Sequence, residues 1–151
     1  YTPRTLFPYT TLFRSPWQGL LLPNAKRHAA AAITARLEQL GFLCSAEQPL
    51  AHLIACTGSS GCGKGLADTK ADAVQLAALH PGHAVHLSGC PRSCAAAHSA
   101  PVTLLAVSPG HYDVYFREAA QPGFGRLHAR TLSIEAAGAL LRAHPRSNTD
   151  D

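Results

Sequence analysis

The sequence predicts an α+β fold, and three observations lead to this class. Short apolar runs alternate with longer segments of helical periodicity, so strands and helices are mixed along one chain. Two pairs of cysteines each follow one of the strand-like runs. The chain has 151 residues, of which 46% are hydrophobic and 15% charged, and this composition suits the core of one domain or slightly more.

The first fifteen residues differ in character from the rest. The run TLFPYTTLFRS, residues 5–15, resembles the in-frame translation of a common sequencing-adapter oligonucleotide, and we interpret residues 1–15 as an assembly artefact. The alternative is a genuine pair of β-strands, because the run is rich in Thr, Tyr and Phe. On the artefact interpretation the natural protein begins well upstream, and we expect this chain to be a C-terminal fragment.

Residues 16–50 are expected to contribute one strand and one helix. The run QGLLL, residues 18–22, predicts a short buried strand, and Trp17 is expected to lie in the core beside it. Asn24 is a candidate cap for a helix over 26–40, which Gly41 is expected to end.

Residues 51–145 contain both cysteine pairs. A strand over 50–56 is expected to lead into the first pair, followed by a helix over 65–79 that buries Leu66 on its apolar face. A second strand over 83–89 is expected to lead into the second pair. This order places both pairs directly after strands.

The C-terminal part predicts a hairpin and a helix. Residues 101–107 and 111–116 are strand-like runs on either side of a Ser-Pro-Gly turn. A helix is expected over 133–144 with Ser133 as its N-cap, and residues 146–151 are expected to be a disordered tail.

The charge and hydropathy patterns argue against two classes of partner. Two of the positive charges lie on Arg4 and Arg14, so residues 16–151 carry a net charge of +2 in place of +4. Without a larger Lys/Arg cluster we expect no nucleic-acid partner. No apolar run approaches the roughly 20 residues of a membrane-spanning helix, and we expect no membrane association and a cytoplasmic location.

The four paired cysteines are the strongest functional signal. Five residues separate Cys56 from Cys62, and three separate Cys90 from Cys94. A cytoplasmic location disfavours disulfides, and Cys44 would leave an odd number of thiols. Structural zinc sites usually place two to four residues between neighbouring ligands, so the five-residue gap is wide for zinc, although not forbidden.

A phosphate-binding loop is a further alternative. Residues 58–64 satisfy the pattern G-x-x-x-x-G-K between an expected strand and an expected helix. The following residue in such loops is Ser or Thr, whose hydroxyl binds Mg²⁺, but here it is Gly65. No later expected strand ends in an Asp that could help to hold the metal, so this alternative is weaker.

A [4Fe–4S] cluster suits the cysteines best. Such a cluster needs four thiolate ligands and a backbone wrapped closely around it. Glycines near the cysteines permit that close approach, and backbone N–H groups can donate to cluster sulfurs. The predicted metal ligands are Cys56, Cys62, Cys90 and Cys94.

The cysteine pattern resembles the signature of the sulfite/nitrite reductase family, in which all four cysteines ligate a [4Fe–4S] cluster. The segments SPWQGLLLP, ACTGSSGC, LADTKADA and VHLSGCPRSCAAAH resemble one branch more closely, precorrin-3B synthase, and the resemblance covers most of residues 16–107. It implies a reductase-type [4Fe–4S] domain over 51–145, preceded over 16–50 by the end of a ferredoxin-like half-domain.

The resemblance also implies a reaction and its partners. The branch is an oxygen-dependent monooxygenase of cobalamin biosynthesis that hydroxylates precorrin-3A and forms a lactone, giving precorrin-3B. The cluster would relay electrons to a further iron centre, sirohaem or a non-haem iron; in the reductases, the cysteine matching Cys94 bridges to the sirohaem iron. The implied partners are a tetrapyrrole and an electron donor, either a reduced nicotinamide system or a ferredoxin-like protein.

Two alternatives to this function remain at the level of the sequence. One is a sirohaem-dependent nitrite or sulfite reductase. The other is a non-catalytic zinc-binding or electron-carrier module. Two cations are candidate cofactor-binding residues: Arg92 for a macrocycle carboxylate and Lys64 for the negative charge of the cluster, although each could equally lie in solvent.

The remaining cysteine and the histidines suggest structural or surface roles. Cys44 is expected to be a small buried hydrophobic residue. His80, His83 and His86 do not share a face in either a helix or a strand, and we expect them at the surface or a sheet edge. His98 is the histidine best placed in sequence to support the cysteine site.

Overall fold

The computed structural model describes residues 13–14, 19–22, 25–96, 100–118 and 123–144. The chain divides into two compact units, Tyr1–Cys44 and Ser45–Asp151. Trp17, Asn24, His98 and the tail 146–151 lie outside the described residues, and their predictions stay predictions.

The first unit contains a short strand pair and one helix. Strand β1 (Phe13–Arg14) pairs antiparallel with β2 (Leu20–Leu21). A 3₁₀ turn, η1 (Arg27–Ala29), continues into helix α1 (Ala30–Gln39). The predicted helix end is confirmed, because Gly41 has a φ of +84° and its N–H donates to the carbonyl of Glu38.

None of the residues described with side chains in this unit is buried. Leu21 is 64% exposed, so the prediction of a buried strand over 18–22 is wrong. The prediction of a buried Cys44 is also wrong: its thiol is exposed and lies near the carbonyls of Thr34 and Phe42. Both errors have the same physical reason, since the described part of the unit supplies no second layer to cover these side chains.

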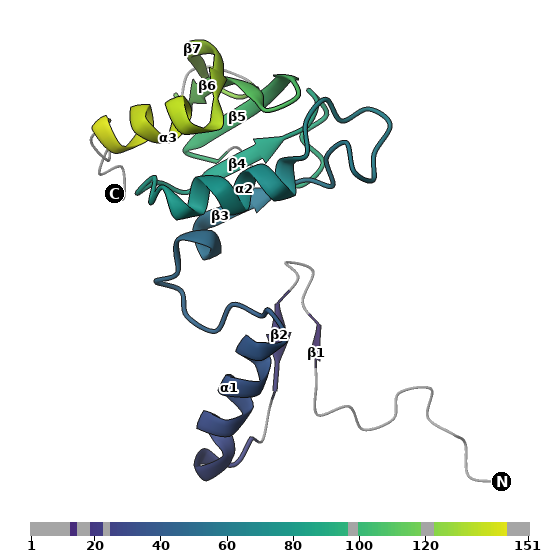
Figure 1. The fold of residues 1–151 in the computed structure, drawn as a ribbon, viewed down its shortest axis with the longest axis vertical. Helices are drawn as coiled ribbons and strands as arrows, with labels where there is room; N and C mark the ends of the chain where they lie inside the picture. Colours follow the sequence, from purple (N-terminus) through teal and green to yellow (C-terminus); the bar gives the residue numbers. More distant parts are fainter. Residues whose placement is uncertain (1–12, 15–18, 23–24, 97–99, 119–122, 145–151) are drawn as a thin grey trace, which may run out of the picture. The chain divides into compact units, whose positions relative to one another are not determined.

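The second unit is built on a five-stranded sheet with the order β3-β4-β5-β6-β7 (Figure 1). Its strands are β3 (Leu53–Ala55), β4 (Val85–Ser88), β5 (Val102–Ser108), β6 (His111–Phe116) and β7 (Arg126–Ser133). The first three strands run parallel, and the last two continue the sheet antiparallel.

Helices α2 (Thr69–Ala78) and α3 (Ile134–Ala143) cover one face of this sheet (Figure 1). The core lies between sheet and helices, and it includes Leu87, Leu104, Tyr112, Leu76 and Leu141. Alternate residues of a strand point to opposite faces, so the neighbours of the core residues on β4 and β5 point away from the helices.

Two expected elements begin later than predicted. Helix α2 begins at Thr69, because Asp68 caps it and accepts a hydrogen bond from the Ala71 N–H. Leu66 therefore precedes the helix and is 48% exposed, contrary to the prediction. The strand expected over 50–56 is only β3, since a 3₁₀ turn, η2 (Pro49–His52), occupies its first half.

Strand β7 was not predicted at all. Its sequence, RLHARTLS, alternates polar with small or apolar residues, and it lies at the edge of the sheet, where few side chains are buried. The register with β6 shifts twice, which weakens the period-two pattern. The other predictions for this unit are confirmed: the hairpin of β5 and β6, and the cap of α3, where Ser133 Oγ accepts from the Ala136 N–H. No helix in the described ranges is long and apolar enough to cross a membrane.

Candidate metal centre

The first cysteine of each pair lies at the same edge of the sheet. Cys56 directly follows β3, and Cys90 follows β4 with only Gly89 between them. The two strands are parallel neighbours with Ala55 opposite Leu87, so their carboxyl ends meet at one edge. The two cysteine-bearing loops therefore begin side by side.

Hydrogen bonds tie the Cys56 thiol to both loops. The Gly89 N–H donates to Cys56 Sγ over 3.1 Å, and Thr69 Oγ1 lies 3.5 Å from the same sulfur. Thr69, which is fully buried, also donates to the Cys56 carbonyl over 2.8 Å. Partial burial acts to raise the pKa of Cys56, but the hydrogen bonds from Thr69 and the backbone outweigh it, so the pKa lies below its ordinary value.

Three glycines permit close backbone contacts, two of them within the first loop and one between the two loops. A Cβ on Gly89 would lie 3.3 Å from both Cys56 Sγ and the Gly65 Cα. A Cβ on Gly65 would lie 2.6 Å from the carbonyl carbon of Gly58, closer than real contacts allow. Gly58 itself has a φ of +68°, a left-handed conformation that favours glycine. The Leu66 N–H donates to the Gly89 carbonyl, which joins the loops a second time.

The second cysteine of each pair lies farther along its loop. Cys62 is held by a turn in which its N–H donates to the Gly58 carbonyl and its own carbonyl accepts from Gly65. Cys94 is exposed and follows Ser93, whose φ of +53° is unusual for a non-glycine residue. All four thiols are free of disulfides.

The chemistry of the site suits a thiolate-bound metal or cluster. Across the described ranges, no group of three or more His, Cys, Asp or Glu side chains is arranged to hold a metal ion, so the four sulfurs are not gathered into one ligand set. The residues nevertheless fit a [4Fe–4S] cluster in two respects. Four free thiols match the number and kind of donors that such a cluster requires, and the glycines permit the close backbone packing that it needs.

A hydrogen-bonded pair formed by buried Tyr112 and partly exposed Asp72 was not predicted. Tyr112, fully buried on β6, donates from its hydroxyl to Asp72 in the first turn of α2. Burial, the hydrogen bond to Asp72 and the nearby negative charges raise the pKa of Tyr112 far above its ordinary value. The polar network of this site therefore includes Thr69 and Tyr112. In the sequence, Asp68 is a favoured N-cap residue, which indicates that a helix begins at Thr69. No sequence pattern indicated a role for Tyr112.

The two candidate cations are exposed on these loops. Lys64 lies between Cys62 and α2, and Arg92 lies between Cys90 and Cys94. The prediction that His86 lies at the surface or an edge is wrong: it is 1% exposed, because β4 is an interior strand. His80 is exposed, whereas His83 is half-buried and contacts the carbonyls of Leu141 and His144.

Comparison with known proteins supports the fold. No protein-family model and no curated protein matches the chain. Among solved structures, the NirA protein of Mycobacterium tuberculosis is similar, with a TM-score of 0.71 and 21% sequence identity over 93% of this chain. The predicted α+β fold class is therefore confirmed, and the fold is similar to that of the NirA protein. The chain spans 31% of the NirA chain.

Proposed function

We propose that this chain is the cluster-binding part of an oxidoreductase of the sulfite/nitrite reductase type. The observation that carries the proposal is the hydrogen bond from Gly89 N–H to Cys56 Sγ, which joins the two cysteine-bearing loops at one sheet edge. In this proposal Cys56, Cys62, Cys90 and Cys94 hold a [4Fe–4S] cluster, which supplies one-electron transfer when bound.

The residues of this chain have distinct parts in that site. Thr69 and Gly89 hold the Cys56 sulfur in place and favour its thiolate form, which is the form that ligates iron. Gly58 and Gly65 let the first loop fold closely on itself, and Gly89 lets the second loop approach it. Lys64 and Arg92 supply positive charge near the four thiolates, which would offset part of the negative charge of a bound cluster.

For the reaction itself we propose a precorrin-3B synthase-like activity. The enzyme would hydroxylate precorrin-3A with dioxygen and form the lactone of precorrin-3B. The support is the resemblance of four sequence segments, above all VHLSGCPRSCAAAH at residues 85–98. The remaining parts of this proposal are a sirohaem or non-haem iron, a nicotinamide-dependent or ferredoxin-like electron donor, and a cytoplasmic location.

The test of the cluster is anaerobic reconstitution of the 151-residue chain with iron and sulfide. We expect about four irons and four labile sulfides per chain, and an EPR signal after reduction. Ser in place of Cys56, Cys62, Cys90 or Cys94 should lower the iron content and change the signal. Cys44→Ser is the matched control and should change neither, because Cys44 belongs to neither cysteine pair.

Two outcomes would overturn the proposal. Zinc at about one ion per chain without labile sulfide would indicate a zinc-binding module. Equal iron loss in Cys44→Ser and in the four test variants would mean that iron binding is non-specific. Once the cluster is established, tight binding of sirohaem would favour the sirohaem-dependent reductase over the synthase.

A further inference from the structure

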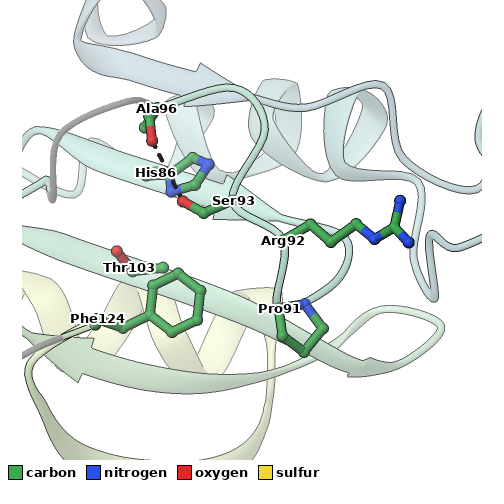
Figure 2. A pocket seen from close by; sticks show the side chains of 8 residues that line it. His86, Pro91, Arg92, Ser93, Ala96, Thr103 and Phe124 are labelled. Carbon is green, nitrogen blue, oxygen red and sulfur yellow. Dashed lines mark hydrogen bonds between the residues drawn. The ribbon is translucent and has the colours of Figure 1, made fainter.

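A cavity of about 390 Å³ lies on the sheet face opposite α2 and α3. Its inner wall is formed by His86 on β4 and Thr103 on β5, which are register partners on adjacent parallel strands. The loop after Cys90 and the segment before β7 form its other walls (Figure 2). The cavity is large enough for a small organic molecule, or for one arm of a larger one.

The inner wall presents two polar groups without a protein partner. His86 and Thr103 are each 1% exposed, yet neither His86 Nε2 nor Thr103 Oγ1 makes a hydrogen bond within the protein. Buried polar groups in folded proteins nearly always have a partner, so this pair points to a bound molecule. Burial lowers the pKa of His86, and its imidazole is therefore neutral at pH 7 and can offer one N–H.

The rest of the lining indicates an anion with an apolar body. The eight lining residues include no Asp or Glu. Arg92 lies on the rim with its side chain directed away from His86 and Thr103 (Figure 2), and no described residue forms an ion pair with it. Phe124 and Pro91 provide apolar walls between the rim and the inner polar pair. Asp113 on β6 accepts a hydrogen bond from the Thr131 N–H.

We propose that this cavity binds an organic carboxylate, which accepts hydrogen bonds from His86 and Thr103 while its carbon chain lies against Phe124. Arg92 supplies positive charge at the entrance. Two sources share this chemistry: a free small carboxylate, or a carboxylate arm of a larger ligand such as a tetrapyrrole. The carboxylate site is inferred from the cavity alone. Only the assignment of the carboxylate to a macrocyclic ligand rests on the proposed function.

The loop geometry connects this cavity to the cysteines. Pro91, Arg92 and Ser93, the three residues between Cys90 and Cys94, all line it. Ser93 donates a long hydrogen bond to the Ala96 carbonyl, which helps to fix the loop over the cavity. A carboxylate bound here would therefore lie against the loop that joins Cys90 to Cys94.

The experiment titrates the full 151-residue chain with two carboxylate probes and an uncharged one. Glutarate represents a free carboxylate, uroporphyrin I represents carboxylate arms on a macrocycle, and glutaramide has the carbon chain of glutarate without its charge. The readouts are the affinity, measured by calorimetry, and the ring ¹⁵N resonances of His86 in the NMR spectrum, assigned by comparison with His86→Leu.

We expect a carboxylate probe to bind and to shift the His86 resonances, whereas glutaramide does neither. Thr103→Val keeps the side-chain shape but removes the hydroxyl, and it should weaken binding about five- to tenfold. Arg92→Gln should weaken binding more than Arg36→Gln, a matched loss of charge on α1 in the other compact unit. If uroporphyrin I binds much more tightly than glutarate, the natural ligand is a macrocycle with carboxylate arms. If only glutarate binds, the natural ligand is a free small carboxylate.

The proposal is overturned if neither carboxylate shifts the His86 resonances, or if glutaramide binds as well as glutarate. It is also overturned if Thr103→Val binds as wild type does and the two arginine variants lose affinity equally. The calorimetric comparison of glutarate, uroporphyrin I and glutaramide is made on the wild-type chain, so a variant that fails to fold leaves the test decisive. Iron and sulfide content is measured separately, which distinguishes failure of this site from failure of the cluster.

Discussion

Adding one methyl group at Gly65 should push apart two segments of the first cysteine-bearing loop, the one that carries Cys56 and Cys62. A Cβ at this position would lie 2.6 Å from the carbonyl carbon of Gly58, 2.7 Å from the Ser59 nitrogen and 2.9 Å from the Gly58 oxygen. These are backbone atoms, which cannot turn aside as a flexible side chain can. To reach an ordinary contact distance of 3.4 Å, the two segments must separate by about 0.8 Å.

The matched control is Gly63→Ala in the same loop. A Cβ on Gly63 meets nothing within 4 Å, and Gly63 is not in the left-handed region. Ala in place of Gly restricts the unfolded chain, which should stabilise the control by about 0.4–1 kcal/mol. In Gly65→Ala the same gain is opposed by an overpacking cost of about 1–3 kcal/mol, so we expect net destabilisation of about 1–2 kcal/mol.

The assay is urea unfolding followed by far-UV circular dichroism, with the midpoint and slope fitted for each variant. Reconstituted iron and sulfide content is measured in parallel, and Gly65→Ala should bind less of both than Gly63→Ala. The reasoning is refuted if the two variants have the same midpoint, or if Gly65→Ala is as stable as the wild type, because the close backbone approach would then not exist in solution.

Two further predictions concern buried polar groups. Tyr112→Phe removes the hydroxyl that donates to Asp72, and it should lower the free energy of unfolding in urea titrations by about 1–2 kcal/mol. The control Tyr115→Phe should have a smaller effect. Equal effects of the two variants would argue against the Tyr112–Asp72 hydrogen bond. His86 has a lowered pKa in the folded chain because of burial, so below its unfolded value near pH 6.5 the unfolded state binds the proton more readily. The unfolding free energy should therefore fall between pH 6.5 and 5 more steeply in wild type than in His86→Leu, and parallel pH profiles would contradict this.

Local patterns predicted most of the second unit. Strands β4, β5 and β6 have apolar residues at alternate or successive positions between turn residues, and Ser133 caps α3, so these elements follow from the sequence. The position of Cys56 and Cys90 at one edge also followed, because each comes directly after a strand. Pairing of β3 with β4 in parallel then placed them together.

What the sequence could not predict depends on tertiary neighbours. Cys44 has the residue type of a core position, yet nothing in the described part of its unit covers it. His86 has the residue type of a surface position, yet an interior strand and the loop after Cys90 bury it. The contact between Gly65 and Gly58 joins residues seven apart through a loop without regular periodicity, so no pattern of spacing predicts it.

The link between Gly89 and Cys56 has a consequence for the order of maturation. The two loops are joined in sequence by α2 and meet only after β3, α2 and β4 have packed as one parallel unit. In a zinc knuckle, by contrast, two ligands lie within one short turn. A cofactor that needs both loops can thus be fully ligated only by a chain already folded in this region, and its binding would in turn stabilise that region. Cofactor content would then report on the folding of this unit.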